Sequence, residues 1–237
     1  MSAASPSRKR GVKAEVPITR EAIVATAFRL IEDRGLTSFS MRSLATELGV
    51  FPATLYWHVG DRSQLLGLVE YEWIRRVELP DEISDWREWM MEVGRRYRSN
   101  AFAHPEVARL ATMERARNSE SLRIPDALLG KLAPLGLNDD LVHAFNALMG
   151  SVRGFVFLEL APRADSSPQE KAAMEAELRS LDPDEFPNLT ANFDQLADRA
   201  LSVRWNDSAD RPLDDSFEYL LRLLIDGIAA QVPRKRK

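Results

Sequence analysis

The sequence predicts an all-α protein, with a small N-terminal three-helix domain followed by a larger C-terminal helical domain. Apolar residues recur at spacings of three and four along most of the 237 residues, which is the period of a helix that packs on one face. No long stretch alternates apolar and polar residues with the period of two that indicates a half-buried strand. Many of the periodic segments also begin with a Ser, Thr or Asp cap or end at a glycine.

The composition excludes several classes of protein. A chain that is 45% apolar has enough residues to bury a core in one or two domains. Because it has no cysteine, it has no disulfide framework and no thiolate nucleophile or metal ligand. No apolar run approaches the roughly 20 residues that span a bilayer, and the basic N-terminus lacks the apolar stretch of a secretory signal. We therefore expect a soluble, cytoplasmic protein without a membrane partner.

The charge is unevenly distributed along the chain. Residues 1–78 carry 11 basic and 9 acidic side chains, residues 79–233 carry 17 basic and 27 acidic ones, and the last four residues are all basic. Phosphates are repelled by the acidic residues 79–233, so we expect a nucleic acid to bind within residues 1–78. For the basic residues 8–13, two interpretations stay open: a solvated, disordered arm, or an arm that touches phosphate or the minor groove.

The first helix is predicted to begin after Thr19 and to stop at Gly35. Thr19 is a good N-cap, and Ile18 and Ile23 flank it at the spacing of a hydrophobic staple. Glycine is the residue that most readily adopts the left-handed conformation in which helices end.

The next two helices are short and lie close together in the sequence. One begins at Ser40 and ends at Gly49; the other begins with Pro52, which is tolerated at a first helical position, and runs through His58. Two short helices joined by a tight turn form a helix-turn-helix, whose second helix lies in the major groove of DNA. Asp61 then begins a connecting helix over Arg62–Val77, with Gln64 completing a capping box.

The second short helix carries an unusual run of aromatic residues. Leu55 and Val59 lie four apart and can form its buried side, so the residues between them project outward. Hydroxyl, indole and imidazole groups can donate to phosphate, and aromatic faces can pack on thymine methyls. The alternative is that Tyr56 and Trp57 are core aromatics of a small bundle. The candidate DNA-contacting residues are Arg42, Phe51, Pro52, Thr54, Tyr56, Trp57, His58 and Arg62.

This pattern resembles the DNA-binding domain of the TetR family of bacterial transcriptional repressors. The resemblance covers about 50 residues and rests on Arg34-Gly35, Ser40-Met41-Arg42-Ser43-Leu44-Ala45, Leu48-Gly49-Val50, Leu55-Tyr56-Trp57-His58-Val59 and Asp61-Arg62. It implies a dimeric repressor that binds a palindromic operator and is released by a small-molecule effector. The sequence departs from the family at two positions: Phe51 stands where a small polar cap is usual, and Pro52 where the tetracycline repressor has a polar base-reading residue. The operator should differ accordingly.

The rest of the chain is predicted to be helical as well. A second capping box, formed by Asp215 and Glu218, begins the last helix. The predicted helices are Trp86–Ala101, Pro105–Met113, Ser121–Ala133, Asp139–Leu160, a broken region over Pro168–Arg199, and Asp215–Val232.

Two of these helices are apolar on more than one face, which predicts a partner. A helix of that kind must be covered on more than one side, either by the core of a large monomer or by a second copy. The resemblance extends to the regulatory domain of the tetracycline-repressor subgroup and implies an intersubunit four-helix bundle. The candidate interface residues are Phe155, Leu158, Phe217, Leu220, Leu221, Leu224 and Ile228.

The resemblance also implies a pocket for a small-molecule effector, between the fourth helix and the helices that follow it. For each candidate residue taken alone, ordinary core is the favoured interpretation. The tetracycline repressor binds its drug with magnesium through histidines, but His104 and His143 do not fall on that metal-binding position. We therefore expect no metal and no cofactor. The candidate pocket residues are Trp86, Trp89, Met90, Val93, Tyr97, Met113, Phe145, Asn146, Met149 and Arg153.

Together these inferences divide the chain into four parts: a disordered basic arm (1–17), a helix-turn-helix domain with its connecting helix (18–78), an effector-binding and dimerisation domain (79–232) and a basic tail (233–237). An enzyme is disfavoured, because the sequence has no phosphate-binding glycine loop, zinc-peptidase motif or nucleophile elbow. A ligand-independent or architectural DNA-binding protein is the remaining alternative. The sequence does not identify the effector, the operator or the regulated genes.

Overall fold

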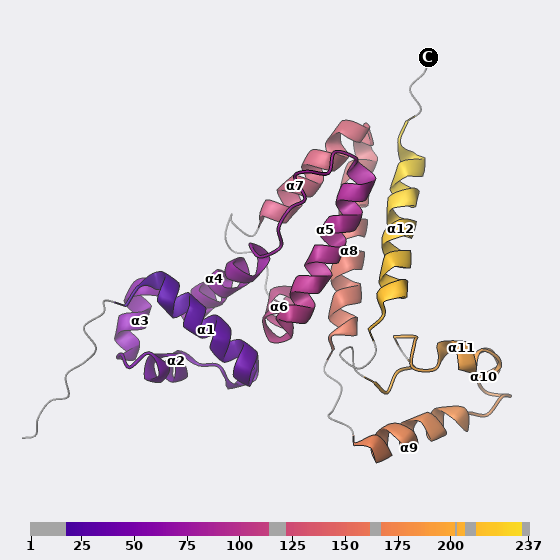
Figure 1. Ribbon diagram of the computed structural model, residues 1–237, viewed down its shortest axis with the longest axis horizontal. Coiled ribbons are helices and arrows are strands. Elements are labelled where there is room, and N and C mark those ends of the chain that lie inside the picture. The colour runs from indigo at the N-terminus through magenta and orange to yellow at the C-terminus, as the bar shows by residue number, and fades with distance from the viewer. Residues whose placement is uncertain (1–17, 114–121, 162–166, 202, 207–211, 234–237) are drawn as a thin grey trace, which may run out of the picture.

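The computed structural model describes residues 18–113, 122–161, 167–201, 203–206 and 212–233. Within these ranges the regular structure is helical, apart from one isolated bridge between Ala200 and Val203, so the predicted all-α class is confirmed. Figure 1 shows a small N-terminal helical unit, joined by a connecting helix to a larger bundle. The predicted basic arm and residues 234–237 of the tail lie outside the described residues.

The N-terminal helices begin and end where the local signals place them. The Thr19 side chain caps the first helix by accepting a hydrogen bond from the amide of Ala22, at 3.2 Å. Gly35 ends it with a φ of 75°, as predicted. Ser40 caps the second helix in a capping box with Ser43, which the sequence analysis did not anticipate. The elements are α1 (Arg20–Arg34), η1 (Leu36–Ser38), α2 (Met41–Glu47), α3 (Pro52–Val59) and α4 (Arg62–Ile74).

The C-terminal domain is a bundle in which three long helices, α5, α8 and α12, run side by side (Figure 1). Helices α6 and α7 pack against α8, and α9 to α11 lie at one end of the bundle. Its elements are α5 (Trp86–Ala103), α6 (Pro105–Met113), α7 (Arg123–Leu132), η3 (Ala133–Leu135), η4 (Asn138–Asp140), α8 (Leu141–Glu159), α9 (Pro168–Arg179), α10 (Pro187–Ala191), α11 (Phe193–Leu196) and α12 (Asp214–Gln231).

One predicted cap is wrong. The capping box expected of Asp215 and Glu218 does not form, and α12 begins one residue earlier without a side-chain cap. Glu218 instead accepts hydrogen bonds from Nε and Nη2 of Arg95 on α5, at 2.6 and 2.7 Å. A two-bond pair with a guanidinium is stronger than one bond from a backbone amide, so the interhelical contact prevails.

A buried ion pair between Arg98 and Glu159 connects the three long helices α5, α8 and α12. The carboxylate of Glu159, at the end of α8, is inaccessible to solvent and accepts hydrogen bonds from Nε and Nη2 of Arg98 on α5, both at 2.8 Å. It also accepts from the amide of Leu213, just before α12, at 2.7 Å. Arg98 has a second partner, the mostly exposed Asp214, at 2.7 Å. The ends of α8 and α12 therefore meet α5 at one charged cluster.

The expectation that no segment is apolar enough to cross a membrane does not hold for the segment that contains α8. Residues Asn138–Glu159 are long and apolar enough by length and composition alone. In the fold, however, α8 packs against α5, α6, α7 and α12, as the central helix of a bundle does. Only 17% of its most apolar window is buried in the single chain, which leaves apolar surface for a partner.

We predict that Glu159→Leu lowers the free energy of unfolding by about 3–5 kcal/mol, because it leaves a mostly buried guanidinium and the Leu213 amide short of an acceptor. Urea denaturation monitored by circular dichroism measures the change. Asp214→Asn is the matched control and should stay within about 1 kcal/mol of the parent, because its carboxylate is mostly exposed. A Glu159→Leu protein as stable as this control would contradict the assignment.

Candidate nucleic-acid interface and ligand cavity

Helix α3 buries one face and exposes the other, as its sequence predicts. Leu55 and Val59 are buried against the N-terminal core. Tyr56 is half-exposed, and Trp57 exposes 87% of its surface. The alternative that Tyr56 and Trp57 are core aromatics is therefore wrong. A large aromatic side chain held in water on a short helix indicates a binding surface.

The first turn of α3 presents a surface without hydrogen-bonding side chains. Phe51 occupies the N-cap position with extended backbone, makes no side-chain cap, and is 71% exposed. Pro52 and Ala53, which follow it, are exposed too. Thr54 is the first polar side chain, and its amide donates to the carbonyl of Phe51 at 2.9 Å. The tip of the helix is therefore apolar, and its polar groups begin one turn later.

Two arginines flank this helix. Arg42 is exposed in the first turn of α2, and Arg62 is exposed at the first position of α4. A capping box between Asp61 and Gln64 fixes the start of α4, with bonds of 2.8 and 3.2 Å. Gly60 has a φ of 71°, and a Cβ there would lie 1.5 Å from the Gln64 side chain, so only glycine fits this turn. Arg62 and the Asp61 cap therefore lie together at the N-terminus of α4, which is the positive end of its dipole.

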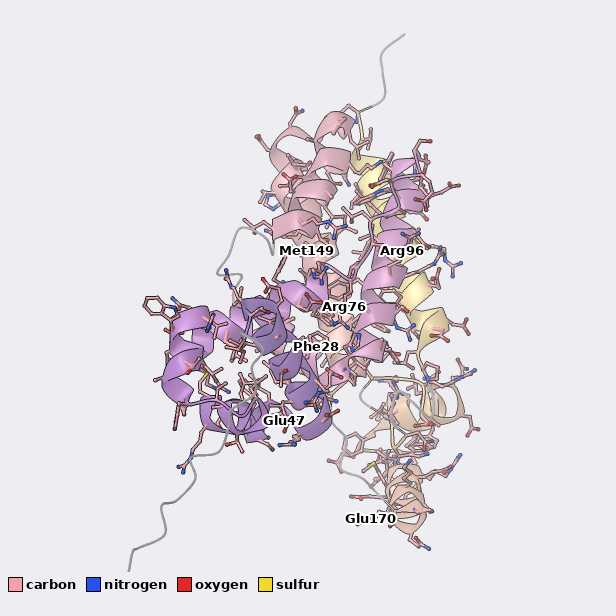
Figure 2. The ribbon with its side chains drawn as sticks, turned by 60° about the vertical axis from the view of Figure 1, so that its left-hand side comes forward. Phe28, Glu47, Arg76, Arg96, Met149 and Glu170 are labelled. Atoms are coloured by element: carbon pink, nitrogen blue, oxygen red, sulfur yellow. The ribbon has the colours of Figure 1, made fainter. Side chains whose placement is uncertain are left out.

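The larger domain contains a mostly apolar cavity of about 810 Å³, counted together with its open mouth. Five of the predicted pocket residues line it: Met90, Val93, Tyr97, Met149 and Arg153. Figure 2 labels Met149, which comes from α8. The sequence analysis expected the fourth helix to border the pocket but named no residue of α4 or α7, because no local pattern tells which of their side chains face the cavity. The missed residues include Glu70, Trp73, Ile74, Ile124 and Leu128.

Four predicted pocket residues lie outside the cavity. Trp86 packs under the guanidinium of Arg87, and Trp89 is buried beside the ammonium of Lys131. Phe145 packs against the general core. Asn146 is exposed on α8, so it is not the buried polar group that was expected. The side chain of Met113 lies outside the described residues.

The polar groups of the cavity come from three helices. Tyr97 on α5 is buried, and this burial raises the pKa of its hydroxyl, an effect that the nearby Arg153 partly offsets. Arg153 on α8 also donates from Nη2 to the carbonyl of Ala111 in α6, at 2.6 Å. Glu70 on α4 is buried at the cavity wall. Within the described ranges, no group of three or more metal-ligating residues could hold an ion.

The predicted dimer residues divide between core and surface. Phe217, Leu221 and Ile228 are buried within their own chain, so little of their surface is left for a partner. They point toward α5 and α8; for example, the ring of Phe217 packs against that of Phe155, at 5.5 Å. Leu158 is exposed, and Phe155, Leu220 and Leu224 are partly exposed. On α8 and α12, the large exposed apolar residues that were not predicted are Val142, Phe157, Tyr219 and Leu223.

The two domains meet where α1 and the end of α4 touch α6. The guanidinium of Arg76 lies 4.1 Å from the centre of the Phe28 ring, and the two side chains are seen close together in Figure 2. Nη1 of Arg76 is 2.9 Å from Nε2 of His104, whose ring stands edge-on to Phe28 at 4.9 Å. The carboxylate of Glu32 accepts from the amide of Val107 at 2.7 Å. A displacement of α6 would therefore change contacts with both α1 and the end of α4.

Comparisons with known proteins agree with this arrangement. Residues 79–232 match the family model described as tetracyclin repressor-like, C-terminal domain, and residues 23–69 match that of bacterial regulatory proteins, tetR family. A transcriptional regulator of helix-turn-helix type from Saccharopolyspora erythraea is 29% identical over 74% of this chain and 75% of its own. The class C tetracycline repressor protein of Escherichia coli is 24% identical over 89% of this chain and 90% of its own.

Solved structures show the same fold. Apo ActR from Streptomyces coelicolor is 30% identical and superposes with a TM-score of 0.71, over 92% of this chain and 99% of its own. ActR in complex with actinorhodin is 28% identical, with a TM-score of 0.75, over 92% of this chain and 100% of its own.

We predict that the junction around His104 makes stability depend on pH. Burial and the nearby Arg76 lower the pKa of His104 below its ordinary 6.5, so the folded protein binds this proton less tightly than the unfolded chain does. Its contribution to stability is therefore present above pH 6.5 and lost as the pH falls through the folded pKa. Unfolding of the parent and of His104→Asn between pH 7.5 and 5.5 should show a smaller loss in the variant. Parallel profiles would contradict the prediction.

Proposed function

Because the chain belongs to the TetR family of bacterial regulatory proteins, we propose that it is a repressor that binds a palindromic operator as a dimer and leaves it when a small molecule fills the cavity. The observation that carries this proposal is the division of α3 into a buried face and an exposed aromatic face. A regulator of this kind acts on chromosomal DNA, and so in the cytoplasm. Its relatives are regulators, and the family gives no support to an enzymatic role.

In the proposed complex, α3 lies in the major groove. Trp57 and Tyr56 face the backbone and the base edges, and Thr54 and His58 add polar contacts from the same helix. Arg42 and Arg62 flank α3 and would neutralise phosphates, helped at Arg62 by the positive end of the α4 dipole.

We propose that dimerisation covers the exposed apolar faces of α8 and α12. Val142 and Leu158 on α8 are at least half-exposed, as are Tyr219 and Leu223 on α12. Cβ atoms built at positions 150, 154 and 227 would meet open space in the single chain, so these glycines allow a second backbone to approach closely. A two-fold dimer would place its recognition helices about 34–36 Å apart, on successive turns of a palindrome.

The position of the cavity allows a bound effector to act on the recognition helix through α4. Helix α4 supplies part of the cavity wall and begins at Arg62 beside α3. A ligand that prefers one position of α4 shifts the population of recognition-helix spacings, and by linkage it weakens binding to the operator. The neighbour ActR, whose structure holds actinorhodin, supports a small-molecule effector for this fold.

The alternative, a ligand-independent or architectural DNA-binding protein, makes a different prediction. Such a protein coats DNA with little sequence preference, and its affinity depends chiefly on salt. Selection of bound sequences from random DNA separates the two, since a palindrome with a defined half-site supports a specific regulator. Tightening of the operator complex by a ligand would make the protein a co-repressed member instead.

We predict that Trp57→Ala weakens operator binding at least about fivefold, because it removes a major-groove contact of the order of 1–3 kcal/mol. The variant should unfold like the parent, since Trp57 is 87% exposed and packs on little. Fluorescence anisotropy with the selected operator measures the affinity. Met174→Ala on α9, another exposed apolar side chain, is the control. Parental affinity in a folded, dimeric Trp57→Ala protein would overturn the proposed interface.

We further predict that the apolar tip of α3 reads thymine methyl groups. Phe51, Pro52 and Ala53 offer no side-chain hydrogen bond, so the base edge that complements them is the C5-methyl of thymine. Replacing the contacted thymine by deoxyuridine removes one methyl group and should weaken binding about fourfold, the effect of one buried methyl.

The test replaces each half-site thymine by deoxyuridine in turn and compares the parent with Phe51→Ser. The variant should lose the difference between the two bases at the contacted position. Deoxyuridine placed outside the half-sites is the control. If no half-site methyl affects the affinity of the parent, the tip does not read thymine.

A further inference from the structure

A residue that lines the cavity carries a buried hydrogen-bond donor without a partner among the described residues. Trp73, near the end of α4, is 1% exposed and lines the cavity. Its Nε1 has no hydrogen-bond acceptor among the described residues. Nearly all buried polar groups of folded proteins are paired, so an unpaired indole N–H at the wall of a ligand cavity points to an acceptor on the ligand.

The surrounding contacts hold this donor in place. The Trp73 ring stands edge-on to the ring of Tyr97, with centroids 5.3 Å apart and an interplanar angle of 84°. The carbonyl of Trp73 accepts a hydrogen bond from Nδ2 of the buried Asn100 on α5, at 3.0 Å. Because both the ring and the backbone are fixed, the indole cannot turn to another partner without breaking these contacts.

The other polar groups of the cavity define the charge that a ligand should carry. The wall carries one acidic and one basic side chain, Glu70 and Arg153, so it has no excess of either sign with which to select an ion. The buried hydroxyl of Tyr97 remains protonated and can donate a second hydrogen bond. Leu128, Leu148 and Val152 are among the apolar side chains that complete the wall and suit a ring-shaped hydrocarbon body.

We propose that the effector is an uncharged ring compound whose carbonyl oxygen, or an equivalent acceptor, accepts a hydrogen bond from Nε1 of Trp73. This inference rests on the proposed effector cavity and specifies the chemistry it recognises. It also gives Trp73 a role in the response, because the bond is made to α4, the helix that begins at Arg62 beside the recognition helix. A ligand without the acceptor fills the cavity but makes no such bond to α4.

A matched pair of probes tests the proposal on the full-length dimer. Fluorenone and fluorene share one three-ring skeleton and differ only in a carbonyl in place of a methylene group. The parent should bind fluorenone roughly tenfold more tightly, because a buried donor that was unpaired becomes satisfied. In Trp73→Phe, which keeps an aromatic ring but lacks the donor, the two affinities should be equal. Trp205→Phe, outside the cavity, is the control and should keep the parental ratio.

The indole proton gives a readout that does not depend on affinity. The protein has five tryptophans, so a ¹⁵N correlation spectrum resolves their indole N–H signals, and the variant identifies that of Trp73. Fluorenone should move this signal downfield, as hydrogen bonding does, and fluorene should not. An unmoved Trp73 signal, or equal affinities of the parent for both probes, would overturn the inference and leave the cavity as a binding site. If neither probe binds, the proposed cavity fails as an effector site as well.

Discussion

The burial of α4 between the two domains is the constraint on which the rest of the structure depends. Leu65, Leu66 and Val69 are buried where α4 packs against α1 and α6, and Trp73 is buried one turn later beside Tyr97 of α5. One helix thus belongs to the core of both domains, and a single cluster of buried residues runs through the molecule. Because interiors are close-packed and transmit strain, a shift of α4 in the cavity strains its packing against the N-terminal domain.

Because the core buries only one face of α3, packing does not determine the side chains on its other face. Helix α3 packs on α1 and α2 through the buried side chains of Leu55 and Val59. The turn at Gly60 and the Asp61–Gln64 capping box at the start of α4 also fix its C-terminal end. The outward face of α3 can therefore be selected for the chemistry of base edges and not for packing. The side chains of Phe51 and Pro52 at the apolar tip are exposed, so close packing in the core does not dictate them.

Signals that act over a few residues predicted the fold well, whereas contacts between helices could not be predicted. The caps at Thr19 and Asp61 and the outward face of α3 followed from spacing alone. The capping box at Asp215 failed, because Arg95, distant in the sequence, binds Glu218 more strongly. Periodicity also marked α12 as apolar on several sides, but it could not tell that Phe217 packs inward while Tyr219 stays exposed. Likewise, no local pattern placed Trp73 at the wall of the cavity.

A ligand can change the affinity for DNA only through contacts that differ between the two positions of α4. The side chains that line the cavity from α5 and α8 stay on the bundle, so binding to them alone is equal in both states and has no effect on the operator. Contacts with α4, through Glu70, Trp73 and Ile74, are the ones that change. Arg153 adds a second route, because its bond to the carbonyl of Ala111 reaches α6, which touches α1 and α4 at the junction. The distinction between a ligand that merely binds and one that induces therefore rests on a few groups of α4 and α6, not on the volume of the cavity.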